Sequence, residues 1–325
     1  MVLKFIILVV EKKFSMNDNV ELEKVLILLS SYNGERFIEE QLNSLLNQTL
    51  HVDILIRDDG STDHTVELIQ KYADKYENIT LITGKNIGFV QSFNTLLMND
   101  VVENYRWIAF CDQDDVWMPQ KMEIAVKALI QSVNPNLPLL YCSNLIITDE
   151  NLQEIGKMHP SSSKVQHSCI FVQNFVTGCT VVFNNVAMQK YRDGIGDYII
   201  AHDYLMHCLC KYFGEIIYDP NSYICYRQHG DNTIGSDHVT YLQGAKNLIS
   251  DLINPQKEKR VNFFAGFLSL YGDELSEKDR NQLLKFIHYR KIHNRIYLFF
   301  NPRISGYDFK TTLAFKIRTL IGRMY

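Results

Sequence analysis

The stretch Trp107-Ile-Ala-Phe-Cys-Asp-Gln-Asp-Asp-Val-Trp117 decides how the rest of the chain is interpreted. Its first five residues are apolar, which is typical of a strand buried in a covered sheet. The run ends in three carboxylates within four positions, and these repel one another unless positive charge lies among them. Because Mg²⁺ and Mn²⁺ prefer carboxylate oxygens, we predict a divalent-metal site at Asp112 and Asp114.

An acidic cluster of this kind can also be a solvated turn or a calcium loop. A solvated turn accounts for most isolated Asp-x-Asp pairs, but here the pair lies between an apolar strand and the helix start at Pro119, which favours the metal. A helix-loop-helix calcium loop is excluded because Val116 and Trp117 occupy its fifth and sixth positions, where a ligand and a glycine are required.

Similar strand–helix units precede this stretch. Apolar strands are expected at 25–29, 52–57 and 79–83, and helical spacing of apolar residues follows each of them and also the acidic cluster. Four such units predict an α/β fold with a parallel, doubly wound, Rossmann-like sheet flanked by helices. Ligands bind beyond the carboxyl ends of such strands. Polar clusters lie at all four ends, at 30–33, 58–63, 86–88 and 112–115.

The pattern changes after about residue 137. Strands are expected at 139–147, 178–183, 216–218 and 223–226, an irregular insertion at 150–175, and a helix at 201–213 that Gly214 ends. Beyond residue 235 helices are expected at 238–253, 257–273, 277–299 and 309–322. We therefore predict an N-terminal extension (1–21), an α/β domain (22–235) and a C-terminal helical, basic region (236–325).

Charge is distributed unevenly along the 325 residues. From Arg280 to the end there are ten Lys and Arg but one acid, Asp308, so this part carries +9 and the remainder −13 of the net −4. Apolar residues alternate with basic ones after Phe309, which is typical of an amphipathic membrane-surface helix. Two alternatives remain open: these helices make peripheral contact with a membrane, or they pack on the α/β domain and expose a basic face.

The seven cysteines form no Cys-x-x-Cys pair, which predicts reduced thiols in the cytoplasm and excludes a disulfide framework or zinc site. The apolar run at 1–10 is too short to span a bilayer. The expected location is cytoplasmic, and on the inner membrane face if the C-terminal helices bind lipid. No nucleic-acid partner is expected.

Several polar residues are candidates for ligand binding. Asp59 offers acceptor oxygens to a base or a ribose. The pair Asp58–Asp59 also suits an Asx turn that caps the next helix. Because Ser61 or Asp63 can cap that helix equally well, the Asp59 carboxylate is expected to be free for a ligand. Tyr32 suits stacking on a base, and Glu35 suits either a ribose or a helix N-terminus. A Gly-x-Gly-x-x-Gly motif is missing after the first strand, which excludes a dinucleotide fold.

Downstream candidates complete the site. Asp203 lies beside His202 at the start of a helix. It is a candidate general base that deprotonates an acceptor hydroxyl, or it is only an acid that stabilises the helix N-terminus. His229 is a candidate third metal ligand or diphosphate-binding residue, or a surface histidine. Arg227 suits a phosphate.

Four segments together, 28–34 (Leu-Leu-Ser-Ser-Tyr-Asn-Gly), 58–63, 86–88 and 112–117, resemble the family 2 inverting glycosyltransferases of the GT-A nucleotide-sugar-binding fold. The resemblance covers residues 24 to about 230. It implies a nucleoside site, a Mn²⁺ or Mg²⁺ ion that Asp112 and Asp114 bind on the donor diphosphate, and Asp203 as catalytic base. Many relatives have Glu-Asp where this chain has His202-Asp203. The implied nucleotide-binding residues are Ser30, Tyr32, Glu35, Asp59, Asn86, Asp112 and Gln113.

Tyr226-Arg-Gln-His-Gly230 and Asn232 resemble the bacterial rhamnosyltransferase-like branch, which builds O-antigen or capsule. The implied reaction moves one sugar, rhamnose from dTDP-rhamnose or a hexose from a UDP-sugar, to a hydroxyl of a glycan or lipid-linked acceptor. Candidates for the acceptor side are Trp117, Gly178, Cys179 and His202. The alternatives are a sugar-nucleotide pyrophosphorylase, whose glycine-rich loop is missing here, and a non-catalytic nucleotide-sugar-binding module, which needs no acid like Asp203.

Overall fold

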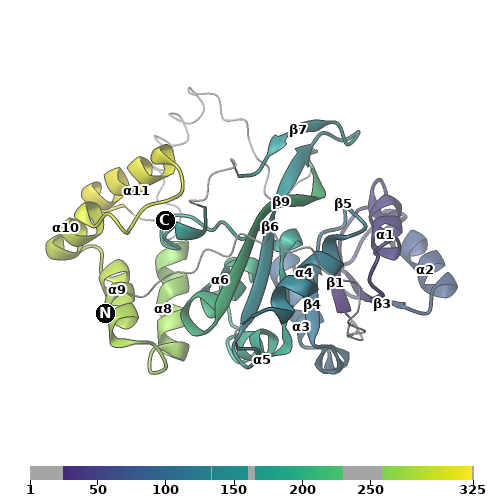
Figure 1. Ribbon diagram of the computed structural model, residues 1–325, viewed down its shortest axis with the longest axis horizontal. Coiled ribbons are helices and arrows are strands. Elements are labelled where there is room, and N and C mark those ends of the chain that lie inside the picture. Colours follow the sequence, from purple (N-terminus) through teal and green to yellow (C-terminus); the bar gives the residue numbers. More distant parts are fainter. Residues whose placement is uncertain (1–24, 133, 160–164, 230–257, 324–325) are drawn as a thin grey trace.

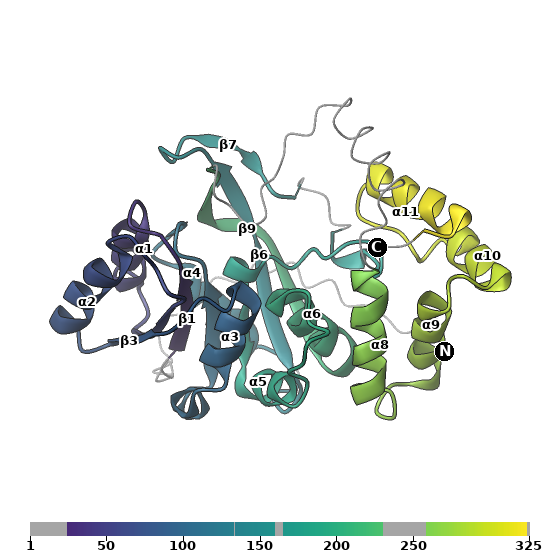
Figure 2. The ribbon, with the colours of Figure 1, turned by 180° about the vertical axis from the view of Figure 1, so that it is seen from behind.

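The computed structural model describes residues 25–132, 134–159, 165–229 and 258–323. Within these residues nine strands form one mixed sheet in the order β3-β2-β1-β4-β8-β6-β9-β5, with β7 paired to β6. Helices cover the sheet, and the C-terminal helices α8 to α11 lie at the end of the molecule opposite α1 and α2 (Figures 1 and 2). The predicted α/β class with a helical C-terminal part is confirmed.

The first half of the chain follows the predicted strand–helix alternation. Strands β1 to β4 are parallel neighbours in the order β3-β2-β1-β4. Each is followed by its helix, and the bounds are β1 (Val25–Ser31), α1 (Ile38–Leu46), β2 (Val52–Asp58), α2 (Thr65–Lys75), β3 (Ile79–Thr83), α3 (Phe89–Leu97), β4 (Trp107–Cys111) and α4 (Lys121–Ile130). All four carboxyl ends therefore reach the same edge of the sheet.

Burial on both faces explains why the strands are apolar throughout. On β1, Leu26 and Leu28 join the buried cluster on one face, whereas Val25, Ile27 and Leu29 join the cluster on the other. Alternate residues of a strand point to opposite faces, so a strand covered by helices on both sides needs apolar residues at every position.

The second half of the sheet makes it mixed. Its strands are β5 (Val116–Trp117), β6 (Leu139–Thr148), β7 (Glu154–Lys157), β8 (Val182–Asn184) and β9 (Glu215–Arg227). Strand β8 runs antiparallel to β4 and β6, whereas β9 runs parallel to β6 and antiparallel to β5. The pairing of β9 places its carboxyl end, with Arg227, beside the acidic turn that follows β4.

Between residues 150 and 227, three sequence-based expectations are corrected by the structure. Gly178–Thr180 is a 3₁₀ turn, so the predicted strand begins only at Val182. The strands expected at 216–218 and 223–226 are one strand, β9, whose register against β6 shifts around Pro220, a residue that cannot donate to the ladder. The insertion at 150–175 contains β7 and is not wholly irregular.

The remaining helices are α5 (Asn185–Arg192), α6 (His202–Phe213), α8 (Lys259–Tyr271), α9 (Glu277–Ile287), α10 (Ile292–Phe300) and α11 (Phe309–Ile321). The single helix expected at 277–299 is broken after Ile287, where the His288 carbonyl accepts a hydrogen bond from the Asn294 side chain (2.9 Å) and Tyr289 turns into the core. None of the described helices is long and apolar enough to cross a bilayer. The predicted N-terminal extension, the helix at 238–253 and the boundary near 235 lie outside the described residues.

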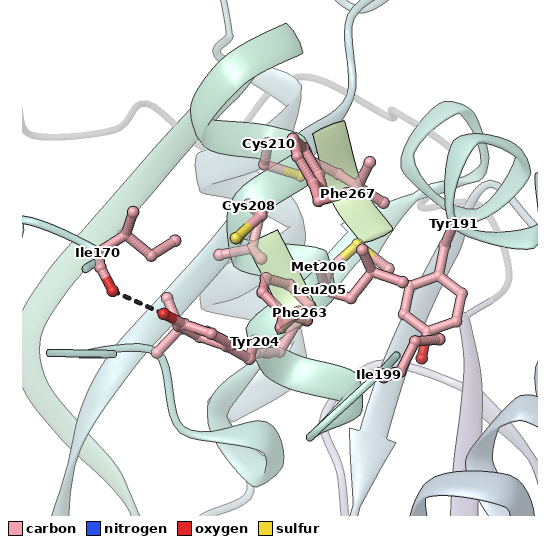
Figure 3. Close-up of a cluster of buried hydrophobic side chains, with 14 of the residues drawn as sticks. Ile170, Tyr191, Ile199, Tyr204, Leu205, Met206, Cys208, Cys210, Phe263 and Phe267 are labelled. Carbon is pink, nitrogen blue, oxygen red and sulfur yellow. Dashed lines mark hydrogen bonds between the residues drawn. The ribbon is translucent and has the colours of Figure 1, made fainter. Parts of the chain in front are cut away.

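Helices α8 and α9 share a buried aromatic cluster with the α/β part. The Tyr204 hydroxyl on α6 donates to the Ile170 carbonyl (2.7 Å), and its ring centroid lies 4.7 Å from that of Phe263 on α8 (Figure 3). Phe171 stacks on Phe286 of α9 with centroids 4.6 Å apart. C-terminal helices therefore pack on the α/β part through α8 and α9, and Leu298 of α10 and Phe315 of α11 belong to the same buried cluster, while membrane contact stays a prediction.

Candidate active site

Gln113 joins the loops that follow β1 and β4. Its side-chain Oε1 accepts a hydrogen bond from Tyr32 N–H (2.8 Å) and its Nε2 donates to the Tyr32 carbonyl (3.0 Å). A Cβ atom at Gly34 would lie 2.3 Å from that Oε1, so this approach requires glycine. The Tyr32 ring stays exposed, as stacking on a base would require. The loop after β1 and the acidic loop after β4 are thus held in one position relative to each other.

Asp59 joins the loops that follow β2 and β3. It accepts hydrogen bonds from Ile87 N–H (2.9 Å) and Gly88 N–H (2.8 Å), and Arg57 binds it as well. The expectation of a free carboxylate is therefore wrong: Asp59 is buried and holds the loop of residues 84–88, and its role in nucleotide binding stays a prediction. Asn86 in that loop is exposed at the rim of the site.

Other predicted nucleotide-binding residues make local contacts. Glu35 accepts a hydrogen bond from His64 N–H (2.9 Å), just ahead of α2, so the helix-terminus alternative is realised. Asp58 forms the Asx turn, accepting from Gly60 N–H (3.1 Å) and Ser61 N–H (2.8 Å). The Ser30 hydroxyl donates to that of Ser92 (2.6 Å). These side chains shape the rim, and ligand contact by Ser30 and Glu35 stays a prediction.

The acidic turn after β4 contacts the end of β9. Asp112 and Asp114 are half-buried and Asp115 is buried. The His229 ring nitrogen Nε2 lies 2.8 Å from Asp114 Oδ2, although 115 residues separate them in the chain. Asp115 Oδ1 accepts a hydrogen bond from Arg227 N–H (3.3 Å). The structure therefore brings together the predicted metal ligands Asp114 and His229.

Arg227 has a structural role that the sequence did not indicate. Its buried guanidinium donates to the carbonyls of Asp114 (2.9 Å) and Glu150 and forms an ion pair with Glu40. These contacts fix the backbone of the acidic turn. The expectation that Arg227 binds phosphate is not supported by this geometry.

We expect Arg227→Met to lower the free energy of unfolding by about 2–4 kcal/mol, because two partly buried carbonyls and the Glu40 carboxylate lose their donor. The midpoint of urea denaturation measures the change. Arg36→Met is the matched control: Arg36 pairs with the Glu150 side chain (2.8 Å), both side chains are about half exposed, and the expected loss is below about 1 kcal/mol. Equal midpoints for the two variants would contradict the structural role.

Electrostatics at the turn favour a bound cation. Burial and the charges of Asp114 and Asp203 raise the pKa of Asp112, so negative charge on this side chain is destabilised in the protein alone. A divalent cation would remove that penalty. Ligand atoms of Asp112, Asp115 and Cys179 lie within 4.8 Å of one another.

The donor set fits a hard cation through its carboxylates. Burial raises the pKa of the Cys179 thiol, which therefore stays protonated and is a poor ligand for Mg²⁺ or Mn²⁺. Asp115 faces Cys179 and the Arg227 backbone. Asp112 and Asp115 are the carboxylates that this cluster brings together, and metal binding by Asp112 and Asp114 stays a prediction.

Asp203 lies at the first turn of α6. It is half-buried, and burial raises its pKa to about 7. Hydrogen bonds from the backbone of Tyr204 and Gly178 act in the opposite direction and lower the pKa, but their effect is smaller. Its charge also reaches Asp112, since it contributes to the raised pKa of that residue. A carboxylate with a pKa near neutrality can take a proton from a hydroxyl and release it again.

His202 serves packing. Its ring stacks on Phe93 with centroids 3.9 Å apart, and burial lowers its pKa to about 3, so it stays neutral. A Cβ atom at Gly178 would lie 2.8 Å from His202 Nε2, so the 3₁₀ turn approaches α6 closely. Trp117, Cys179 and His202 are all buried, and their contact with an acceptor stays a prediction. Gly178 is buried too, and contacts Asp203 through its N–H.

Asn174 and His207 were missed by the sequence analysis. Asn174 Oδ1 accepts from His207 Nδ1–H (2.7 Å) and Val176 N–H (3.1 Å), which orients the amide so that Nδ2 points to Asp203 Oδ2 (3.4 Å). His207 follows Asp203 by four residues on one face of α6, and this spacing was the available signal. Asn174 lay in a segment expected to be irregular.

Residues 26–183 match the family described as Glycosyl transferase family 2. The chain carries a family 2 glycosyltransferase domain. This chain is 29% identical over 220 residues to dTDP-rhamnosyl transferase RfbG of Shigella flexneri. The alignment covers 64% of this chain and 74% of that relative. This assignment argues against the pyrophosphorylase and the non-catalytic module.

Solved structures share the fold of the glycosyltransferase. TarS 1-349 of S. aureus in complex with UDP superposes with a TM-score of 0.54 at 17% identity, covering 86% of this chain and 72% of that one. The mannosyltransferase PcManGT of Pyrobaculum calidifontis, in complex with GDP-Man and Mn²⁺, gives 0.52 at 14% identity, covering 93% and 88%. At these identities the likeness concerns the fold.

Proposed function

We propose that the protein is an inverting, metal-dependent glycosyltransferase that moves one sugar from a nucleoside diphosphate sugar to an acceptor hydroxyl. The observation that carries the proposal is Asp203: a half-buried carboxyl with a pKa raised to about 7, within electrostatic reach of Asp112. Asp203 is suited to act as a general base, and Asp112 and Asp114 are suited to hold a cation. This combination supports a single displacement.

Each residue has one role in this proposal. Asp203 takes the proton of the acceptor hydroxyl, the acceptor oxygen bonds to the anomeric carbon, and the bond from that carbon to the diphosphate breaks with inversion. A metal held by Asp112 and Asp114 would neutralise charge on the departing diphosphate. Asn174 holds Asp203 in orientation, and Gln113 holds the loop that carries Tyr32.

The donor and acceptor classes come from the relatives. The name of RfbG supports dTDP-rhamnose as the first candidate donor. A UDP-hexose is the second candidate, and bacterial surface polysaccharide is the product that the sequence resemblance implies. A glycan or lipid-linked hydroxyl is the proposed acceptor. All seven cysteines are free thiols, which supports a cytoplasmic location, and a lipid-linked acceptor would place the enzyme at the inner membrane face.

The test is release of nucleoside diphosphate by the purified chain with Mn²⁺ or Mg²⁺ and a panel of dTDP-rhamnose, UDP-glucose, UDP-GlcNAc and GDP-mannose. We expect one donor to be hydrolysed slowly without acceptor, and no release in the presence of EDTA. Failure of every donor to bind in the presence of metal would overturn the proposal.

We expect Asn174→Ala to raise the pKa of Asp203, because the carboxylate loses a donor that stabilises its charged form. The acid limb of kcat/KM should move upward by up to about one pH unit, and kcat at pH 7 should fall up to about tenfold. His207→Ala should move the limb in the same direction by less, since Val176 still orients the amide. A pH–rate profile that stays unchanged in Asn174→Ala would assign Asn174 to folding alone.

A further inference from the structure

Helix α10 exposes one apolar face. Ile292, Ile296 and Phe300 recur every fourth residue and are exposed, and Phe300 is 72% exposed. Asn294 and Leu298, on the other side of the helix, are buried. The helix therefore packs on the protein with one side and presents large apolar side chains to solvent with the other.

Helix α11 has the same arrangement. Its exposed apolar residues lie every three or four positions, and Phe309 at its start is 78% exposed; the set is Phe309, Leu313, Ile317, Leu320 and Ile321. The opposite side buries Phe315 and Thr319. We call the eight exposed residues of α10 and α11 the apolar hairpin face.

The two helices pack against each other as an antiparallel pair (Figure 1). Lys316 Nζ on α11 donates to the carbonyls of Leu298 (2.7 Å) and Asn301 (2.9 Å), where α10 ends. Beyond the last turn of α11, the Arg295 guanidinium of α10 lies against Gly322. These contacts hold the pair in a defined arrangement while its apolar residues stay in solvent.

Basic residues accompany the apolar hairpin face. Residues 290–323 contain eight Lys and Arg and one acid, Asp308. Arg290 forms an ion pair with Glu258 (2.8 Å), whereas Lys291, Arg303, Lys310 and Arg323 are exposed. The Asp308 carboxylate accepts from Thr311 N–H (2.7 Å) as the N-cap of α11, so it is engaged locally. Among the residues of α10, α11 and their connection that the structure describes, the exposed charge is therefore mainly positive.

We propose that the apolar hairpin face docks the enzyme on an anionic lipid surface, the apolar side chains entering the interface and the basic ones contacting phosphate headgroups. Large apolar side chains left exposed on two packed helices are typical of an interaction site. Charge complementarity selects lipid over a second copy, because a symmetric dimer through this face would bring two basic surfaces together. The inference goes beyond the transfer reaction and does not depend on it.

The test is flotation of the full chain with vesicles of phosphatidylcholine alone or with 30% phosphatidylglycerol, without nucleotide sugar. We expect binding to the anionic vesicles, and at least about tenfold weaker binding by Phe300→Glu/Phe309→Glu, because each charged replacement removes an apolar ring from the lipid interface. Met98→Glu/Leu270→Glu is the matched control, because both residues are large, apolar and about half exposed but lie elsewhere; its binding should be unchanged.

A charge variant separates the two contributions. Lys310→Ser/Arg323→Ser should weaken binding to anionic vesicles by more than about tenfold at low salt and leave binding to neutral vesicles unchanged. Equal binding by wild type and Phe300→Glu/Phe309→Glu overturns the proposal. The proposal is also overturned if the wild-type chain does not bind vesicles but forms a dimer, and Phe300→Glu/Phe309→Glu is a monomer. That result would assign the face to self-association. Circular dichroism confirms that each variant is folded.

Discussion

Asp203→Asn abolishes sugar transfer and leaves donor binding intact: this is the result we expect if Asp203 is the base. Loss of a general base costs about 10²–10⁴ in rate, so kcat should fall at least about 100-fold. Asp197→Asn, an exposed acid six residues earlier, is the matched control and should retain full activity. Calorimetry of the nucleoside diphosphate with Mn²⁺ should give the same affinity for both variants.

The raised pKa of Asp203 predicts how the wild-type enzyme depends on pH. The base must be ionised, so kcat/KM should fall as the pH drops below about 7. Transfer by Asp203→Asn that matches wild type would show that another group takes the proton.

Stability should change in the opposite sense. The folded protein holds a proton on Asp203 up to about pH 7, whereas the unfolded chain releases it near the ordinary value of 3.8, so this group destabilises the fold progressively as pH rises between these values. Above pH 7 the neutral Asn removes that penalty. We therefore expect the Tm of Asp203→Asn at pH 8 to exceed that of wild type by at least about 2 °C. A lower Tm would mean that the charged form is well stabilised in the fold.

Asp114→Ala should remove metal-dependent nucleotide binding. The variant deletes one proposed metal ligand and the partner of His229, which lies 2.8 Å away. In calorimetry with Mn²⁺, the affinity for the donor nucleotide should fall at least about 100-fold and approach the value that wild type shows with EDTA. Asp100→Ala, which removes an exposed acid from the same domain, is the control.

The magnitude follows from the charge that the metal would neutralise. Without a cation, a diphosphate would face Asp112 and Asp203 at close range, and like charges in a partly buried site repel strongly. Binding by Asp114→Ala that is as tight as in wild type, with the same metal dependence, would place the ion at other ligands, for which Asp115 is the nearest carboxylate candidate.

The strands could be predicted because their signal is local. Burial on both faces of the sheet makes β1 and β4 continuous apolar runs, and the polar residues that end them are the ones that lie at the binding edge. His229 was a candidate third metal ligand on the chemistry of its side chain alone, and the structure places it against Asp114 although 115 residues separate them, while metal binding by His229 stays a prediction.

The errors have a common physical cause, which is that a side chain's partners are set by tertiary contacts. Asp59 seemed free because a neighbour could cap α2, yet the backbone of residues 87 and 88 binds it. Arg227 seemed available to phosphate, yet Glu40, 187 residues earlier, pairs with it. Asn174 carried no periodic signal at all. Hydropathy patterns report burial and not the identity of the partner.

The packing of Tyr204 against Phe263 limits how this enzyme can be recombined with its relatives. Tyr204 is adjacent to Asp203, so the helix that presents the proposed base rests on side chains supplied by α8. A chimera that exchanges the C-terminal helices between relatives would have to carry over the residues of α6 that face them, or the carboxylate would lose its orientation before any difference in substrate preference could be measured.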